Sequence, residues 1–364
     1  MGMLTKLKSQ MVNLRVFRPY FPIAKTLRDM VTFPWDYARG GKSRPYPSII
    51  NFNITTRCNL RCEFCFNKDN IVGKPGELSL DEIRRVIKQS AKHRPGFFLT
   101  GGEPFSRKDI FEIIDTIKRY SLPVGLVTNG MFLDEEKVGR LIRLGTDVVI
   151  VSFHGTEEVH DRVVGHKGAF QKSMAGLKLL ASRMSPPGPM INYIISEQSI
   201  DSLQPFLDEA MKIDNLVIRL SHLNFLTQKE VDAQKALWAK KFPDVPLDIL
   251  SFTYECDTER FRKVQQILDN PKYKDVFTKP ILSEQDFANW YSNDFQLGRQ
   301  CVFIWRSTFI NADGTVYPCQ FLYVPMGNVR DQNLGDIWNN DLYQRFRNTI
   351  KEGLMPGCSR CCKL

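Results

Sequence analysis

Short apolar runs alternate with amphipathic segments along the middle of the chain, from about residue 48 to residue 221. The runs are rich in β-branched and aromatic residues and are bounded by glycine, proline or polar turns, which predicts buried strands. The expected strands are 48–54, 96–100, 124–128, 147–152, 190–195 and 216–220.

Helical patterns fill the intervals between these runs. In the first interval, Ser79 and Glu82 form a capping box, and Ile83, Val86 and Ile87 recur at helical spacing. The other expected helices are 108–120, 134–144, 170–183 and 202–211. Six such β-α repeats with continuous apolar strands predict an α/β fold with a parallel sheet curled toward a barrel.

Polar clusters fall directly after the expected strands. Cysteines follow the first strand, "TGGEP" the second, "TNG" the third and "SFHG" the fourth, while Asn192 lies on the fifth. Because chemistry in such sheets sits at the carboxyl ends of the strands, we expect these clusters to converge on one face.

The rest of the chain divides into three further parts. Residues 1–45 form a basic amphipathic segment, either lying in a membrane interface, packing across one end of the barrel or docking a partner. The barrel itself spans 46–222. Residues 223–300 break the β-α rhythm and are expected to be a mostly helical insertion that caps the barrel, and 301–364 carry the second group of cysteines.

Composition limits the class of protein. The 364 residues are 43 % hydrophobic and carry a net charge of +10, an excess that often reflects solubility alone. Eight of the nine cysteines gather at two places without a signal peptide before them, which favours metal ligation in a reducing compartment over disulfides. No apolar run reaches the length of a membrane span, so we expect a cytoplasmic protein, with peripheral membrane contact through residues 1–30 as an alternative.

The first cysteine group is "CNLRCEFC", with Cys58, Cys62 and Cys65. Soft thiolate ligands select zinc, copper(I) or iron-sulfur clusters. A structural zinc site needs four ligands, whereas three cysteines on a [4Fe-4S] cluster leave one iron open. A zinc site completed by a distant ligand is the alternative.

These residues resemble the CxxxCxΦC motif of radical S-adenosylmethionine (SAM) enzymes, and "GGEP" at 101–104 is similar to the second-strand motif of that family. The resemblance covers roughly residues 48–221. It implies a partial (β/α)6 TIM-like barrel, a [4Fe-4S] cluster whose open iron is chelated by SAM, and reductive cleavage of SAM to a 5′-deoxyadenosyl radical that abstracts a hydrogen atom from a substrate C–H bond.

The same resemblance assigns further residues. The Gly101, Gly102, Glu103 and Pro104 turn would hold the SAM ammonium, and an acid on a glycine turn can approach a cation closely. Phe64 would contact adenine, or else serve only as a core anchor. Three polar strand residues would bind ribose or carboxylate groups: Asn129, Ser152 and Asn192. Arg162 and Arg219 can pair with the SAM carboxylate or a substrate anion, or else form ordinary salt bridges.

The histidines carry weaker signals. His154 follows the fourth strand and is a candidate substrate contact or proton donor. We expect His160 and His166 to lie solvated in a polar loop, and we see no constellation around His93 or His222.

The second cysteine group supplies four thiolates, from Cys301, Cys319, Cys358 and Cys361. Gly314 precedes Cys319 at a Gly-x4-Cys spacing, and the block resembles the Twitch or SPASM appendage of radical SAM enzymes, which implies one auxiliary [4Fe-4S] cluster. Cys362 is either a spare thiol or a substitute for Cys361, and a zinc staple is the alternative for the whole block. We expect Cys256 to be an ordinary buried thiol.

Family members use a low-potential electron donor, here expected to be a flavodoxin or ferredoxin. The expected substrate is a peptide or a small molecule, with a lipid as the alternative suggested by the basic N-terminal segment. The sequence shows no aromatic-interleaved basic patch, so we do not expect nucleic acid as a partner. A competing interpretation is a zinc-stapled interaction protein without catalysis, but such a staple has no use for Glu103 at a strand end.

Overall fold

The fold is described from a computed structural model. The structure describes residues 37–38, 41–42, 44–65, 76–249, 258–292 and 300–363. The expectations for membrane contact through residues 1–30 and for Cys256 lie outside the described residues. None of the helices in these ranges has the length and apolar character needed to span a bilayer.

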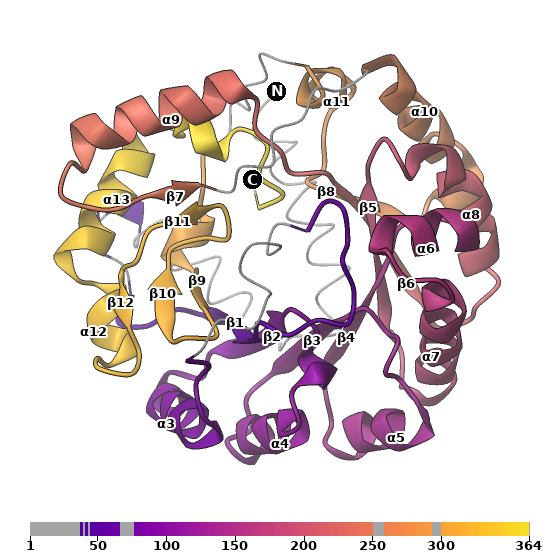
Figure 1. Cartoon of the computed structure of the whole chain (residues 1–364), viewed down its shortest axis with the longest axis horizontal. Helices are drawn as coiled ribbons and strands as arrows, with labels where there is room; N and C mark the ends of the chain where they lie inside the picture. Colours follow the sequence, from indigo (N-terminus) through magenta and orange to yellow (C-terminus); the bar gives the residue numbers. More distant parts are fainter. Residues whose placement is uncertain are drawn as a thin grey trace.

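The core of the fold is a curved sheet of six parallel strands joined in sequence order, as predicted (Figure 1). The strands are β1 (Ile49–Thr55), β2 (Gly96–Gly101), β3 (Val124–Thr128), β4 (Val148–Phe153), β5 (Met190–Ile195) and β6 (Val217–His222). Two of them match the predicted bounds, and the others shift by one or two residues. Such small shifts are expected because patterns locate elements better than their ends.

Helices cover the outside of this sheet (Figure 1). They are α3 (Leu80–Ser90), α4 (Ile110–Arg119), α5 (Glu135–Arg143), α6 (Glu157–Val164), α7 (Ala169–Arg183) and α8 (Leu203–Ala210). The predicted capping box opens α3, where the Glu82 amide donates to Ser79 Oγ and the Ser79 amide donates to Glu82 Oε2. Ile83, Val86 and Ile87 are buried in the core between helix and sheet, as the apolar stripe requires.

The parallel sheet extends beyond the six predicted strands. Strand β8 (Phe277–Lys279) pairs with β6, and β9 (Ser307–Ile310) pairs with β1, both in parallel. On the β9 side the sheet continues antiparallel through β10 (Thr315–Tyr317) and β12 (Gly327–Asn328). The residues expected to form a helical cap and an appendage therefore also supply both ends of the barrel sheet.

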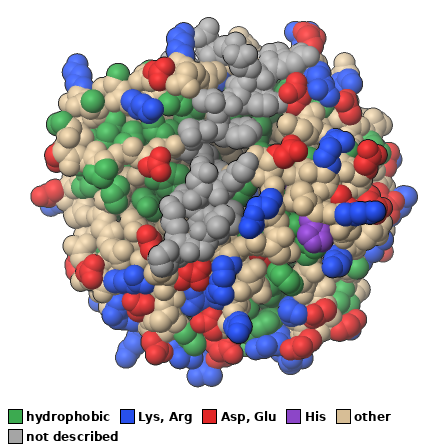
Figure 2. Space-filling view, viewed as in Figure 1, with side chains coloured by type: hydrophobic (Ala, Val, Ile, Leu, Met, Phe, Trp, Pro, Cys, Tyr) green, Lys and Arg blue, Asp and Glu red, His purple; other side chains and the backbone are tan. Residues whose placement is uncertain are grey.

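The remaining elements surround the C-terminal part. Residues 223–300 are mostly helical where described, with α9 (Gln228–Lys241), α10 (Thr258–Leu268) and α11 (Glu284–Trp290). The short strands β7 (Asp248–Ile249) and β11 (Leu322–Tyr323) pair with each other, and the chain ends with α12 (Leu334–Trp338) and α13 (Asp341–Glu352). On the face seen in Figure 2, basic and acidic side chains are interspersed, so the net charge of +10 is not gathered into one patch there.

Candidate active site

Polar side chains line the inner face of the sheet near the carboxyl ends of β4, β5 and β6. Ser152 pairs with Asn192 and Asn192 pairs with Arg219, so these residues form one row across neighbouring strands. Arg219 Nε donates to Asn192 Oδ1 at 2.8 Å. Two residues toward the amino ends, the same face is apolar, with Ile150, Met190 and Val217 packed together. The structure thus brings Ser152, Asn192 and Arg219 together above an apolar floor.

The loop that carries Cys58, Cys62 and Cys65 leaves β1 and packs against the end of α6. The amides of Arg61 and Glu63 donate to the carbonyls of Val164 and Val163, each at 3.0 Å. These bonds satisfy carbonyls at the helix end and fix the loop at the carboxyl edge of the sheet.

A second anchor holds the beginning of this loop. Glu77 Oε1 accepts hydrogen bonds from the Thr56 amide at 2.7 Å and from Thr55 Oγ1 at 2.8 Å. These bonds keep the pKa of Glu77 below its usual value although burial opposes them. Sequence reasoning missed Glu77, because nothing local distinguishes it from a solvated acid.

The three thiols are suited to metal ligation. Burial raises the pKa of Cys62 to about 12 and raises that of Cys58 as well, so both are thiols in the absence of a metal. Binding of iron displaces these protons, because the thiolate is the ligand. Three cysteines on one eight-residue loop fit a [4Fe-4S] cluster with an open iron.

Glu103 is the main acidic group beside this loop. Its side chain is 1 % exposed, and burial raises its pKa to about 7 against the effect of its hydrogen bonds. Those bonds come from Thr128 Oγ1 at 2.8 Å and from the amides of Asn129 at 2.7 Å and Phe105 at 3.2 Å. Among the described residues no cation pairs with it, so a desolvated carboxylate stands ready for a cationic ligand. This fits the ammonium group of SAM.

The glycines of "GGEP" lie against the start of the cysteine loop. A Cβ on Gly101 would lie 2.4 Å from the Thr55 carbonyl oxygen, and one on Gly102 would lie 2.2 Å from the Arg57 carbonyl oxygen. The Gly102 and Glu103 amides donate to the same two carbonyls at 2.9 and 2.8 Å. The glycines therefore allow the turn to press against the start of the cysteine loop, and Pro104 is buried behind it.

Asn129 ties the third strand end to the cysteine loop. Its side-chain amide donates to Asn59 Oδ1 at 2.8 Å, while its backbone amide donates to Glu103. The strand-end turns after β1, β2 and β3 are thus joined by hydrogen bonds, as the expected convergence requires.

Phe64 and His154 meet above the ends of β1 and β4. Their rings make an edge contact with centroids 4.7 Å apart, and Phe64 is 9 % exposed. Burial holds the pKa of His154 well below its usual value, so its imidazole is neutral. A neutral imidazole can accept a proton or direct a hydrogen bond at a substrate.

The expectation for His160 is wrong. His160 lies on α6, a helix that the sequence did not reveal, and is 1 % exposed, stacked on His154. Its Nδ1 accepts a hydrogen bond from the His154 amide at 3.2 Å, and burial lowers its pKa to about 4. Arg162, on the same helix, is 55 % exposed and lies 4.0 Å from Glu158. The structure therefore does not bring Arg162 into the polar row of the inner face.

The four cysteines of the second group surround one apolar pocket. Cys301, Cys319, Cys358 and Cys361 line it with Leu322 and Phe346 among others. Amides of Leu322 and Lys363 lie 3.3 and 3.4 Å from the sulfurs of Cys319 and Cys361. Within the described part of the chain, no three His, Cys, Asp or Glu side chains are grouped as ligands of a single metal ion. Four thiols around a shared apolar space with amide donors to sulfur fit a closed [4Fe-4S] cluster.

Cys362 lies outside this set of pocket-lining cysteines. The Gln320 side-chain amide is 3.6 Å from its sulfur, and its own amide donates to Asn224 Oδ1 at 2.9 Å. Asn224 comes two residues after the end of β6. The C-terminal tail therefore lies over the β6 end of the barrel.

A buried ion pair holds this tail in place. The Arg360 guanidinium is fully buried, and its Nη1 contacts Glu230 at 2.6 Å while its Nε donates to the Trp290 carbonyl at 2.7 Å. Glu230 also closes the capping box of α9 with Thr227. The sequence contains this capping box but offers no signal that its acid would reach Arg360.

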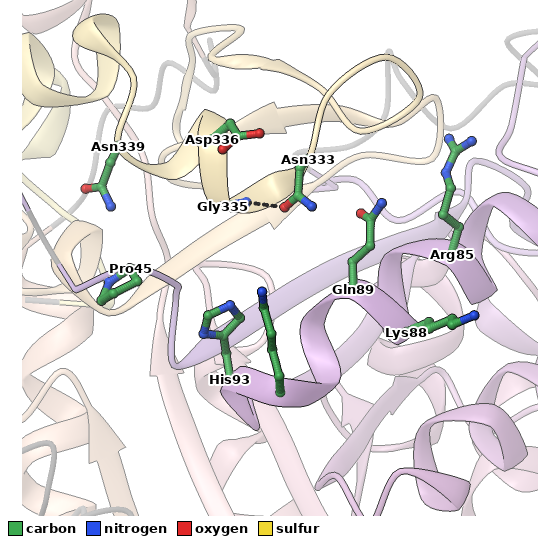
Figure 3. A pocket seen from close by; sticks show the side chains of 10 residues that line it. Pro45, Arg85, Lys88, Gln89, His93, Asn333, Gly335, Asp336 and Asn339 are labelled. Atoms are coloured by element: carbon green, nitrogen blue, oxygen red, sulfur yellow. Dashed lines mark hydrogen bonds between the residues drawn. The ribbon is translucent and has the colours of Figure 1, made fainter.

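A separate polar pocket of about 820 Å³ lies between α3 and α12 (Figure 3). Arg85, Lys88 and His93 line one side of it and Asp336 lines the other. Because Pro45 and His93 come just before β1 and β2, this pocket sits at the amino ends of the strands, opposite the cysteine loop.

Comparison with known families assigns both parts of the chain. Residues 52–210 match the Radical SAM superfamily, and residues 301–362 match SPASM, an iron-sulfur cluster-binding domain. The chain is 28 % identical to the AdoMet-dependent heme synthase of Methanosarcina barkeri, covering 86 % of this chain and 88 % of that protein. It is 26 % identical to the PqqA peptide cyclase of Granulibacter bethesdensis, covering 87 % and 79 %.

Solved structures share the fold. SuiB of Streptococcus suis bound to its precursor peptide SuiA superposes with a TM-score of 0.63 at 14 % identity, over 89 % of this chain and 72 % of that chain. The enzyme anSMEcpe with bound AdoMet gives 0.56 at 16 % identity, over 83 % and 81 %. The two family matches, together with the two cysteine sets, identify the chain as a radical SAM enzyme with a C-terminal SPASM domain, whose cofactors are a [4Fe-4S] cluster, SAM and auxiliary iron-sulfur.

Proposed function

We propose that this enzyme modifies a peptide by abstracting a hydrogen atom from one of its C–H bonds. The observation that carries the proposal is the hydrogen-bonded set of Glu103, Asn129 and Asn59, which joins a buried carboxylate to the three-cysteine loop. When bound, the reduced cluster and SAM supply the 5′-deoxyadenosyl radical that performs the abstraction. The electron comes from a flavodoxin or ferredoxin.

The residues of the chain bind and orient the cofactor. Glu103 receives the SAM ammonium, since its carboxylate is desolvated and aimed at the ends of β2 and β3. Phe64 packs against the adenine, and Asn129, Ser152 and Asn192 provide hydrogen bonds to ribose or carboxylate oxygens. His154 contacts the substrate as a neutral imidazole. Arg162 reaches an anion of SAM or substrate only by turning from the exposed position beside Glu158.

The cysteine sets would hold two separate clusters within one fold. Cys58, Cys62 and Cys65 would ligate the SAM-binding cluster, and Cys301, Cys319, Cys358 and Cys361 the auxiliary cluster. The sheet continuing from β1 into β9 supports a fixed relation between them. Gln320 follows Cys319 directly. A side-chain amide is not a base, so Gln320 does not remove a proton from the substrate beside the auxiliary cluster.

A peptide substrate is supported by the similarity to PqqA peptide cyclases, which extends over 87 % of the chain. A second candidate is a tetrapyrrole, because the AdoMet-dependent heme synthase and the Fe-coproporphyrin III synthase of Methanosarcina barkeri are 28 % and 24 % identical over similar lengths. Both candidates use the same SAM site and differ only in what the inner face must accept.

The first test is anaerobic reconstitution with iron and sulfide, followed by a 5′-deoxyadenosine assay with dithionite. We expect about eight irons per chain in the wild type and about four in a Cys58/Cys62/Cys65→Ala variant, which should not cleave SAM. PqqA-type peptides and Fe-coproporphyrin III are then compared for stimulation of deoxyadenosine formation and for a mass change. Stoichiometric zinc and no deoxyadenosine from either protein would replace the proposal with a structural zinc clasp.

A further inference from the structure

We propose that Arg219 and Lys279 form a binding site for a carboxylate of the substrate, at the inner face of β6 and β8 beneath the C-terminal tail. The inference rests on the proposed function, since it identifies where that function holds its substrate. Lys279 lies at the end of β8, a strand that was not predicted from the sequence.

The strand register places the two cations on one face. Ser221 pairs with Lys279 and Arg219 pairs with Phe277, so Arg219, Ser221 and Lys279 all point to the inner face of the sheet. Phe277 packs with the apolar floor beneath this layer, which confirms the direction of β8 side chains. Arg219 and Lys279 are therefore diagonal neighbours on adjacent strands.

Asn192 orients Arg219 within this layer. Its Oδ1 accepts from Arg219 Nε at 2.8 Å and from Ser221 Oγ at 2.6 Å. Among the described residues, Arg219 makes no other hydrogen bond, so Asn192 fixes the guanidinium while its terminal nitrogens stay available. A guanidinium held in this way is arranged for a carboxylate.

The charges of Lys279 and Arg219 repel one another at this site. Burial lowers the pKa of Lys279 to about 7, and the charges of Lys363 and Arg219 add to this effect. Burial also lowers the pKa of Arg219 to about 10, while Cys362 opposes the change. A bound anion would relieve this repulsion.

The location suits a substrate anchor. On one side, Asn192 and Ser152 lead along the sheet toward the proposed SAM site. On the other side, Lys279 is within electrostatic reach of Cys361, which lines the auxiliary pocket. A carboxylate held between these groups would place the attached carbon chain between the two cluster sites.

The test uses the reconstituted enzyme with both clusters, reduced with dithionite, with S-adenosylhomocysteine filling the SAM site. The probe is glutarate labelled with carbon-13 at its carboxyl groups, whose resonance broadens when it binds near a paramagnetic cluster. The variants are Arg219→Gln, Lys279→Met and Lys279→Arg. Lys212→Met is the control, since Lys212 is exposed and pairs with Glu209 at the surface.

We expect broadening in the wild type, in Lys279→Arg and in the control. Affinity should fall about tenfold in Arg219→Gln and in Lys279→Met, because each loses a charge-assisted bond. Iron content and S-adenosylhomocysteine affinity should stay at wild-type levels in every variant, and uncoupled deoxyadenosine formation from SAM should be unchanged in the Lys212→Met control.

Three results would overturn the inference. Absence of broadening in the wild type would show that no carboxylate binds near a cluster. Weaker S-adenosylhomocysteine binding in Arg219→Gln would place Arg219 in the cofactor site. Iron loss or a changed auxiliary-cluster spectrum with unchanged glutarate binding would show that the cations balance the charge of the cluster. Failure of the wild type to form deoxyadenosine would instead refute the proposed function. This outcome differs from the three that overturn the carboxylate site, so the two hypotheses are tested separately.

Discussion

Glu103 and Asn129 are joined by a 2.7 Å hydrogen bond from the Asn129 backbone amide to Glu103 Oε2. This bond connects the turns that follow β2 and β3, and the Asn129 side chain continues the connection to Asn59 in the cysteine loop. The carboxylate is therefore held by the turns that follow β2 and β3, and Asn129 links it to the cysteine loop after β1.

Replacing Glu103 with Gln should weaken SAM binding by about ten- to a hundredfold, because the ammonium of SAM would lose a buried anionic partner. The clusters should remain, since Glu103 is not a ligand in this assignment. Equilibrium dialysis with labelled SAM and an iron count measure both. Glu63→Gln is the matched control, because Glu63 is an exposed acid within the cysteine loop. Equal SAM affinity in the Glu103→Gln variant and the wild type would remove Glu103 from the SAM site.

Cys361 and Cys362 should respond differently to replacement. Cys361 lines the pocket with the three other cysteines, whereas Cys362 contacts Gln320 and Asn224. We expect Cys361→Ala to reduce the iron content from about eight to about four per chain, or to leave a damaged cluster, while Cys362→Ala keeps about eight. Iron analysis and electron paramagnetic resonance measure the outcome. Iron loss in Cys362→Ala but not in Cys361→Ala would make Cys362 the cluster ligand and Cys361 the spare thiol.

The sequence predicts the barrel well where local pattern and final burial agree. Strands β3 and β5 match their predicted bounds because each is a mostly apolar run that follows a proline and ends before a polar residue. Strand β8 escaped prediction because its three residues, Phe277–Lys279, end in a charge and carry no period of their own. It forms because it pairs with the free edge of β6, and this pairing exists only once the sheet has folded.

Candidate site residues follow the same rule. The cysteines and Glu103 were predictable from their spacing and resemblance, since each motif lies within a few adjacent residues. Helix α6 has only eight residues, so its pattern is short, and the burial of His160 depends on packing against Phe153 and Phe170 from other elements. Contacts that join distant segments, such as Glu230 with Arg360, leave no mark on local sequence.

The Glu230–Arg360 pair should be important for stability. Replacing Glu230 with Gln would leave the fully buried Arg360 without its charge partner, which typically costs about 3–5 kcal/mol. We expect a lower melting temperature and easier loss of auxiliary iron, because Arg360 precedes Cys361 directly. Asp244→Asn is the control, since its pair with Arg345 lies on the surface and should leave the melting temperature unchanged. Equal melting temperatures for both variants would show that the tail is held by its other bonds.

His222 should make the protein sensitive to acid. It is 1 % exposed at the end of β6, where Nδ1 lies 2.9 Å from the Tyr291 hydroxyl and the ring packs against Phe287 and Trp290. Burial lowers its pKa to about 3 from the ordinary 6.5. Below about pH 6.5, His222 is therefore protonated in the unfolded chain but stays neutral in the folded protein. The stability from neutral His222 is therefore complete above this pH and is lost as the pH falls toward 3. Compared with His222→Gln, whose amide does not titrate, the wild type should lose up to about 1.4 kcal/mol more unfolding free energy per pH unit between about pH 6 and pH 4. Urea unfolding at several pH values measures the two slopes, and parallel slopes would mean that His222 accepts its proton in the folded state.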